Sequence, residues 1–163
     1  MINGFIVASR QWCENETHRA IPTQTIRVAF DGFPGSSGDI ILPKPRLVSV
    51  TTVQYIDSDG VTQSLTETTD FVIDKYSEPG IIYPAYNTTW PTTRNVQNAL
   101  TVTYVAGYGA AGVDVPQGIK QAMFLIFGHW YENREEVIVG TISSEIANAA
   151  KALLMQYKVE AVR

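Results

Sequence analysis

The chain has 163 residues, of which 45% are hydrophobic and 17% charged, a composition that excludes wholesale disorder and suits one folded domain. Its net charge is −4, without a basic stripe to grip phosphates, and no apolar stretch approaches the roughly 18 residues of a membrane span. Lone Cys13 cannot form an internal disulfide, which indicates synthesis in a reducing cytoplasm.

The first predicted element is a helix over residues 2–16. Its apolar face is formed at helical spacing by Ile2, Phe5, Ile6, Ser9, Trp12 and Cys13. No Ser, Thr or Asp precedes this apolar run as an N-cap. Either a preceding segment or another subunit is therefore expected to cover this end.

From residue 22 to residue 108 the hydrophobic period changes to two. Strands are predicted over residues 26–30, 40–42, 48–55, 61–65, 71–73, 81–83 and 100–106. Thr51-Thr52 interrupts the alternation and indicates a bulge, and Asp59-Gly60 indicates a hairpin turn. Six or seven short strands at this spacing favour an antiparallel sheet or a small sandwich.

The last third is predicted to be helical. Pro116 suits the first position of a helix whose apolar stripe consists of Ile119, Ala122, Met123, Ile126, Phe127 and Trp130. A linker at 137–141 leads to an expected N-cap at Ser143-Ser144. The face of the final helix comprises Ile146, Ala149, Ala150, Leu153, Leu154 and Tyr157. The three helices are expected to pack together.

These elements predict an α+β fold. Residues 1–21 and 109–163 form a small helical core, with one N-terminal helix and two C-terminal helices. Residues 22–108 form a large antiparallel β insertion within a single subunit, 1–163.

The sequence predicts no catalytic, metal-binding or cofactor-binding residue. Cys13 and His18 match no common zinc-ligand spacing, and His129 is expected to be a partly buried neighbour of Trp130. The Gly-rich stretches at 32–38 and 107–112 lack the Lys-Ser/Thr of a phosphate loop. An enzyme would need a pocket that gathers Asp57, His129 or Glu132, and their spacing gives no reason to expect one.

Three aromatic residues stand in a Pro/Thr/Asn-rich loop, 83–98, that has little core pattern: Tyr83, Tyr86 and Trp90. Two interpretations stay open. They cap the sheet, or they are exposed anchors of a protein contact or a sugar platform.

A set of short motifs in one order along the chain resembles a known family. The most specific are Val115-Pro116-Gln117-Gly118-Ile119-Lys120-Gln121-Ala122, His129-Trp130-Tyr131-Glu132-Asn133-Arg134-Glu135 and Val139-Gly140-Thr141. Others are Pro22-Thr23-Gln24-Thr25, Leu42-Pro43-Lys44-Pro45, Val48-Ser49-Val50, Ser77-Glu78-Pro79-Gly80, Trp90-Pro91 and Ala106-Gly107-Tyr108-Gly109. In this order they resemble the head–tail connector (adaptor) proteins of long-tailed phages, in the branch described as possible DNA-packaging proteins.

The resemblance implies a structural subunit of the virion, made in the bacterial host cytoplasm. Subunits of this family form a ring, typically a dodecamer, below the portal protein. The ring extends the DNA channel and receives a head-completion (stopper) or tail protein beneath it. No catalysis and no cofactor are implied. Members typically carry a further helix before the one that matches residues 2–16, and no counterpart stands in this sequence.

Subunit or partner contacts are expected at Tyr83, Tyr86, Trp90, Glu132, Arg134, Glu135, Tyr157 and Arg163. Arg134 is expected to pair with a carboxylate of its own chain or a neighbour, and by family analogy residues 155–163 dock against the portal. An acidic ring wall would let DNA pass without specific binding. The alternative is a β-rich module of a phage tail that binds carbohydrate or protein through Tyr83, Tyr86 and Trp90.

Overall fold

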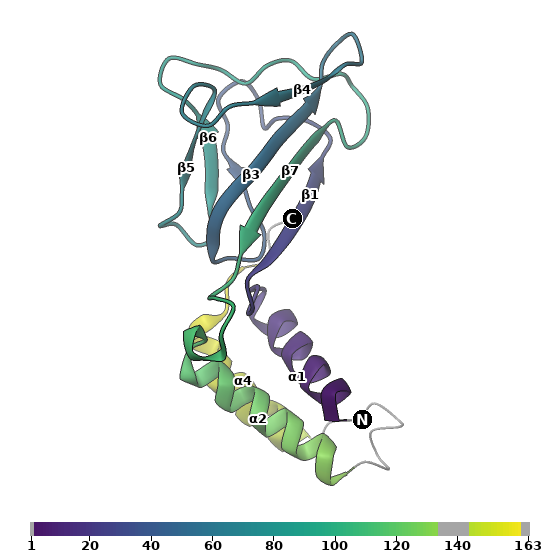
Figure 1. Ribbon diagram of the computed structural model, residues 1–163, viewed down its shortest axis with the longest axis vertical. Coiled ribbons are helices and arrows are strands. Elements are labelled where there is room, and N and C mark those ends of the chain that lie inside the picture. Colours follow the sequence, from purple (N-terminus) through teal and green to yellow (C-terminus); the bar gives the residue numbers. More distant parts are fainter. Residues whose placement is uncertain (1, 134–143, 161–163) are drawn as a thin grey trace. The chain divides into compact units, whose positions relative to one another are not determined.

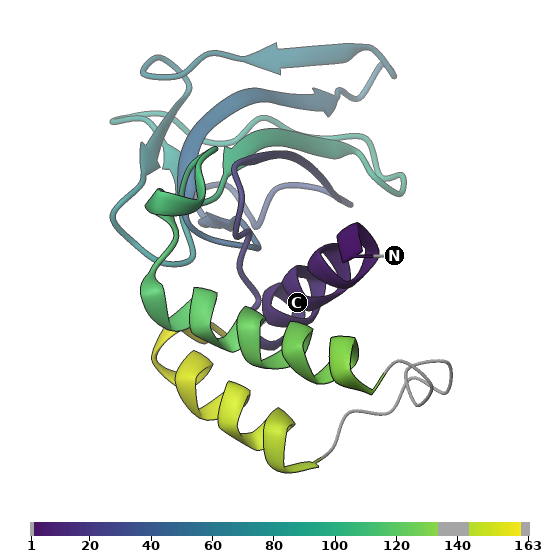
Figure 2. The same cartoon turned by 60° about the horizontal axis from the view of Figure 1, so that its bottom comes forward.

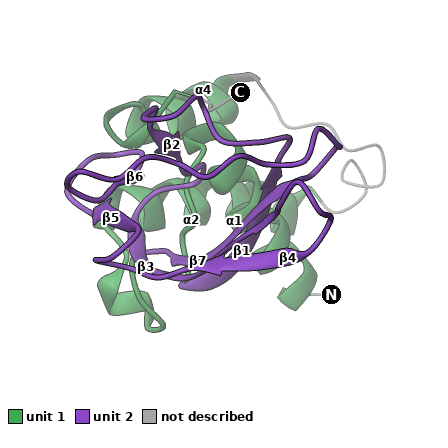
Figure 3. Ribbon diagram, turned by 90° about the horizontal axis from the view of Figure 1, so that it is seen from above, with its two compact units in different colours: residues 1–22, 108–161 green, residues 23–107, 162–163 purple. Residues whose placement is uncertain are grey.

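The computed structural model describes residues 2–133 and 144–160 (Figure 1). The described chain divides into a helical unit, residues 2–22, 108–133 and 144–160, and a β unit, residues 23–107 (Figure 3). The described residues form one N-terminal helix, then seven strands, then two C-terminal helices. The predicted α+β fold is therefore confirmed.

The helical unit is built from α1 (Ile2–Thr17), α2 (Gln117–Glu132) and α4 (Ser144–Leu154). Figure 2 shows α2 and α4 side by side with opposite chain directions, and α1 packs against α2. The three helices pack together and bury one core, as predicted, but Ile2 and Ile6 of the apolar face predicted for α1 are exposed. The members of this core are Cys13, Ile21, Ile119, Ala122, Ile126, Ala150 and Leu154.

The ends of these helices differ slightly from the prediction. Pro116 precedes α2 as its N-cap, with an extended ψ of 140°, instead of occupying the first helical position. The final helix ends at Leu154 and is followed by a 3₁₀ turn, Met155–Tyr157. The linker predicted at 137–141 and the N-cap at Ser143 lie outside the described residues, as does the side chain of Ser144.

The β unit contains two antiparallel sheets, where the sequence predicted an antiparallel sheet or a small sandwich. The larger has the order β1-β7-β3-β4, with strands Gln24–Phe30, Leu100–Ala106, Leu47–Ile56 and Thr62–Leu65. The smaller has the order β2-β6-β5, with strands Ile40–Ile41, Ile81–Pro84 and Phe71–Asp74. The register shifts between Val50 and Thr52, which confirms the predicted bulge.

Strand β7 lies in the interior of the larger sheet and supplies much of the core. Its residues alternate between buried and half-buried, and Val102 pairs with Val28 on one side and Val53 on the other. The hydroxyl of Tyr104 donates a hydrogen bond to the carbonyl of Pro43, and burial raises the pKa of this phenol. The alternation makes β7 the strand most clearly encoded in the sequence.

The chain enters and leaves the β unit through neighbouring segments. Gln24 and Ala106 pair at the first position of the β1–β7 ladder. Just before and after it, the amide of Tyr108 donates to the carbonyl of Ile21 at 3.0 Å, and Pro22 and Gly109 form an isolated bridge. The β unit is thus an insertion between α1 and α2 whose entering and leaving segments pair with each other.

Candidate assembly surfaces

The outer face of the larger sheet has the composition expected of a solvated surface. Because side chains alternate along each strand, the register assigns one set of residues to this face. It consists of Thr25, Arg27, Ala29, Ser49, Thr52, Gln54, Ser64, Thr101, Thr103 and Val105. Gln54 also donates a hydrogen bond to Ser64 across the strands, at 3.3 Å. Such a polar outer face is typical of an antiparallel sheet that covers a core with its other side.

The outer face of the smaller sheet is different. Ile40, Ile82 and Phe71 point to the buried side, so the alternate positions face outward. The outward positions include four apolar residues, Ile41, Val72, Ile81 and Tyr83, which we call the sheet patch. Ile41 pairs with Ile81, and Val72 pairs with Tyr83. Ile41 is 42% exposed and Tyr83 38%, so this sheet presents apolar side chains on both faces.

Helix α2 also carries more apolar surface than its core contact uses. Its buried stripe is Ile119, Ala122, Ile126 and His129. Phe124, Phe127 and Tyr131 follow one another at spacings of three and four residues along another side, and we call them the helix stripe. Phe124 is 63% exposed and Tyr131 41%, and the rings of Phe127 and Tyr131 stack at 5.9 Å. A helix that is apolar on more than one side normally has a partner on each.

The three predicted aromatic anchors separate in the structure. Trp90 is buried, its indole Nε1 donates to the carbonyl of Gly38 at 2.7 Å, and its ring stacks on Phe33 at 4.8 Å. Trp90 therefore follows the first interpretation and caps the β unit. Tyr86 is 92% exposed, and Tyr83 belongs to the sheet patch. The three do not form a common open platform.

The charged end of α2 is only partly described. Glu132 is exposed at the last turn, and Asn133 caps the helix through a 3.0 Å bond from its amide to the carbonyl of His129. The Nδ2 atom of Asn133 also lies 3.1 Å from Nδ1 of buried His129. His129 thus has a structural role at the helix end. Three predicted contact residues, Arg134, Glu135 and Arg163, lie outside the described residues.

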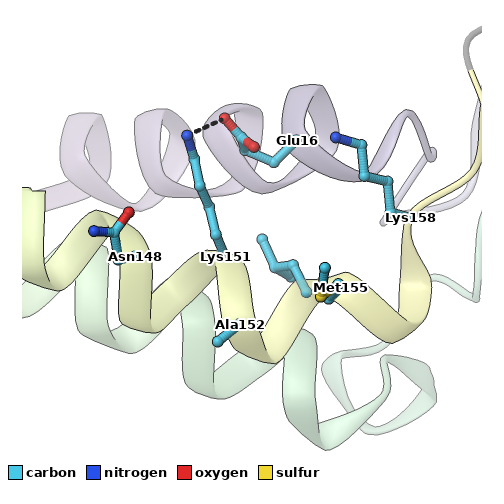
Figure 4. A pocket seen from close by; sticks show the side chains of 7 residues that line it. Glu16, Asn148, Lys151, Ala152, Met155 and Lys158 are labelled. Atoms are coloured by element: carbon cyan, nitrogen blue, oxygen red, sulfur yellow. Dashed lines mark ion pairs between the residues drawn. The ribbon is translucent and has the colours of Figure 1, made fainter.

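A shallow hollow of about 330 Å³ lies between α1 and α4 in the helical unit (Figure 4). Lys151 of α4 reaches Glu16 of α1 across it, with Nζ 3.5 Å from Oε1, and Lys158 borders one end. Both ends of this ion pair are solvent-accessible, so the pair is screened and contributes little stability. The apolar part of the lining comes from Ala152, Leu154 and Met155.

Tyr157 lies at the C-terminal end of the helical unit, where its side chain packs against the helical core. The Nε of buried Arg19 donates a hydrogen bond to the backbone carbonyl of Tyr157. Two residues after Tyr157, the backbone amide of Val159 donates a hydrogen bond to the backbone carbonyl of Thr17 at 3.1 Å. These contacts hold the C-terminal segment to the end of α1.

The titratable groups with perturbed pKa values all have structural causes. Burial raises the pKa of the Cys13 thiol to about 12, with help from nearby Glu14 and Glu16. The side-chain hydrogen bond from Gln63 and backbone bonds lower the pKa of Asp57, and bonds from Ser77 and Tyr76 lower that of Asp74. Among the described residues, no group of three His, Cys, Asp or Glu could hold a metal ion. No described helix is long and apolar enough to cross a membrane.

The whole described chain is therefore a three-helix unit with an inserted two-sheet β unit. The sequence matches no protein-family model and no curated protein. Chains of three solved structures are similar to it over 99% of its length. One structure is described as "Neck of native GTA particle computed with C12 symmetry"; its chain is 20% identical, with a TM-score of 0.77 and 84% of that chain covered.

A second chain comes from a structure described as "Neck of empty GTA particle computed with C6 symmetry". It is 18% identical, with a TM-score of 0.78 and 78% of that chain covered. The third comes from "Virion of native gene transfer agent (GTA) particle", at 20% identity, a TM-score of 0.76 and 78% coverage. At these identities the likeness establishes a shared fold.

Sequence reasoning missed most members of both apolar surfaces. The sequence predicts Ile41 and Ile81 only as residues of short strands, and Val72 likewise, because alternation alone does not tell whether the second face of a sheet is covered. The core stripe predicted for α2 includes Phe127 but neither Phe124 nor Tyr131. A signal was present in the sequence, since the apolar residues of α2 spread far beyond one helical face.

Proposed function

We propose that this protein is a structural subunit of the head–tail neck of a phage or phage-like particle. It forms a ring beneath the portal, extends the DNA channel and joins head to tail. The observation that carries the proposal is the likeness, over 99% of the chain, to chains from two neck structures with TM-scores of 0.77 and 0.78. The order of motifs along the sequence supports the same assignment to the connector (adaptor) family, in its DNA-packaging branch.

The proposed assembly is a ring of twelve copies. The neck structures that resemble this chain were computed with C12 and C6 symmetry, and both are compatible with twelve copies around one axis. The partners would be the portal protein on one side and a stopper or tail protein on the other. Glu132, Arg134, Glu135, Tyr157 and Arg163 stay our proposed contact residues in the helical unit, and Tyr83 and Tyr86 in the β unit.

DNA would pass through this ring without specific binding. The chain has 16 acidic and 12 basic residues, so its net charge is −4 and a ring of copies repels phosphates at long range. A channel of this kind guides DNA by shape and by exclusion. If Lys and Arg line the bore of the assembled ring while the acidic residues face outward, this part of the proposal is wrong.

We propose no catalytic activity. Cys13 and His129, two residues from which catalytic chemistry could be built, are buried. The carboxylates of Asp57 and Asp74 accept hydrogen bonds within tight turns. The alternative of a carbohydrate-binding or protein-binding module loses support from the burial of Trp90, since its aromatic platform required all three residues to be open.

The test is the mass of the native assembly. The purified chain is measured by native mass spectrometry, alone and after addition of the portal ring encoded with it. We expect a closed ring of about twelve copies, given the C12 symmetry of the similar neck. A chain that stays monomeric and does not bind the portal ring would overturn the proposal.

A further inference from the structure

A closed ring of more than two copies needs two different surfaces on each copy. In such a head-to-tail contact one surface of each subunit meets the other surface of the next, and the rotation between them closes the ring. Besides the exposed Ile2, Ile6 and Val7 of α1, the described residues offer two apolar surfaces that belong to different units. The sheet patch belongs to the β unit, and the helix stripe belongs to α2. They are also of different geometry, one a sheet face and the other a helix side.

The two surfaces are suited to each other. A sheet with an uncovered apolar face and a helix with an uncovered apolar stripe bury both by packing as layers. The sheet patch presents Ile41, Val72, Ile81 and Tyr83, and the helix stripe presents three aromatic rings. Aromatic side chains on such a surface are the usual anchors of protein interfaces.

One charged residue at the border of each surface has a counterpart of opposite charge at the border of the other. On the outward side of the smaller sheet, Asp74 pairs with Ile81 and so lies next to the sheet patch. On α2, Lys120 stands four residues before Phe124 and continues the helix stripe. Glu132 follows Tyr131 at the other end of the helix stripe and is exposed. Asp74 at the border of one surface and Lys120 at the border of the other favour contact between the two surfaces.

We infer that the sheet patch of one copy packs against the helix stripe of the next copy around the ring. This inference rests on the proposed function and names the contact from which the ring is built. Phe124 and Tyr131 are the side chains inserted into the interface, and Ile41 and Tyr83 are the residues that receive them. The occupant of each surface is a second copy of this chain.

The experiment uses two full-length variants. One removes the sheet patch by Ile41→Thr with Tyr83→Thr, and the other removes the helix stripe by Phe124→Gln with Tyr131→Gln. The replacements suit a strand and a helix, respectively, and all four positions are at least 38% exposed, so the fold is retained. A control variant carries Val113→Thr with Met155→Gln. Val113 is 82% exposed and Met155 77%, and neither residue belongs to the sheet patch or the helix stripe.

Each variant is expected to raise the concentration needed for ring assembly by on the order of tenfold or more, as for loss of interface anchors. The control is expected to assemble like the original chain. A 1:1 mixture of the two variants has one intact pair of surfaces, so it should form a dimer that cannot grow. Circular dichroism and thermal unfolding of each variant establish that it is folded.

Rings formed normally by both folded variants, or a mixture that stays monomeric, would overturn the inference while leaving the proposed function intact. Dimers formed by one variant alone would also overturn it, because a head-to-tail contact cannot pair identical surfaces. If the original chain neither forms a ring nor binds a portal ring, the proposed function fails, and this inference fails with it.

Discussion

Arg19 and Tyr157, far apart in the sequence, are joined by a hydrogen bond from the guanidinium Nε to the backbone carbonyl oxygen. Arg19 is 7% exposed and follows α1, while Tyr157 ends the last described turn of the helical unit. The bond is part-buried, so removing the charged donor costs more than an exposed hydrogen bond would. The pair therefore fixes the C-terminal segment to the helical core.

We predict that Arg19→Met lowers the free energy of unfolding by about 2 kcal/mol, the contribution typical of a hydrogen bond to a charged group. The measurement is chemical denaturation followed by circular dichroism. Arg10→Met is the matched control, since the Arg10 side chain is 36% exposed and its Nε lies 3.8 Å from Glu14. The control should lose less than about 1 kcal/mol, as expected for an ion pair between residues i and i+4 of one helix. Equal losses in the two variants would contradict the prediction.

The two glycines of α2 should respond oppositely to alanine. At Gly128 a Cβ would meet nothing within 4 Å, so Gly128→Ala should stabilise the helix by about 0.5–1 kcal/mol. At Gly118 a Cβ would stand 2.8 Å from the ring of Tyr157. The free energy of unfolding of Gly118→Ala should therefore be lower than that of Gly128→Ala by about 1 kcal/mol or more, because the ring of Tyr157 must shift to make room for the Cβ. Thermal unfolding of both variants tests this, and equal midpoints would argue against the close contact.

The thiol of Cys13 is expected to be unreactive in the folded chain. It is fully buried, and its pKa is raised from 9.0 to about 12, so hardly any thiolate is present at pH 8. Iodoacetamide should label it only after unfolding, as seen by mass spectrometry. Because the folded pKa is raised, the associated stability is present below pH 9.0 and is lost as pH rises towards about 12. Labelling at equal rates in native and unfolded chains would refute the prediction.

Asp57 should make the β3–β4 hairpin sensitive to acid. Its carboxylate accepts bonds from the Gln63 side chain at 2.8 Å and the Val61 amide at 2.9 Å, which lower its pKa from 3.8. The stability it contributes is present above that ordinary value and is lost as pH falls through the lower folded pKa. Asp57→Asn should therefore narrow the difference in melting temperature between pH 7 and pH 3. An unchanged difference would show that the carboxylate charge is not involved.

Local pattern was sufficient to predict most elements of this fold. Alternation located β7 at residues 100–106 without error, and the Thr51-Thr52 interruption located the bulge in β3. These signals are local, because side-chain direction along one strand or helix depends on neighbouring residues. The sequence predicts Pro116 at the first helical position, and the structure has it one residue earlier, as the N-cap of α2. Local pattern does not distinguish the two positions, because the proline ring fits both.

Long-range features could not be predicted in this way. The order β1-β7-β3-β4 joins the first strand to the last, and nothing in either segment specifies that pairing. The burial of Trp90 depends on Phe33 and on the carbonyl of Gly38, which are more than fifty positions away in the chain. Which face of the smaller sheet is open depends equally on distant contacts, so the sheet patch became visible only in three dimensions.

The neighbouring entry and exit of the β unit have a consequence for the order of folding. Before Ile21 and Tyr108 can pair, the long intervening segment must bring its ends together, at an entropic cost of about 4 kcal/mol by loop-closure scaling. Pairing of β1 with β7 accomplishes this within the β unit itself, at Gln24 and Ala106. Once that ladder exists, α1 and α2 are held close to each other and the helices associate as if joined by a short loop. We therefore expect the β unit to fold first. The helical unit, which is built from the segments before and after the β unit, should fold second.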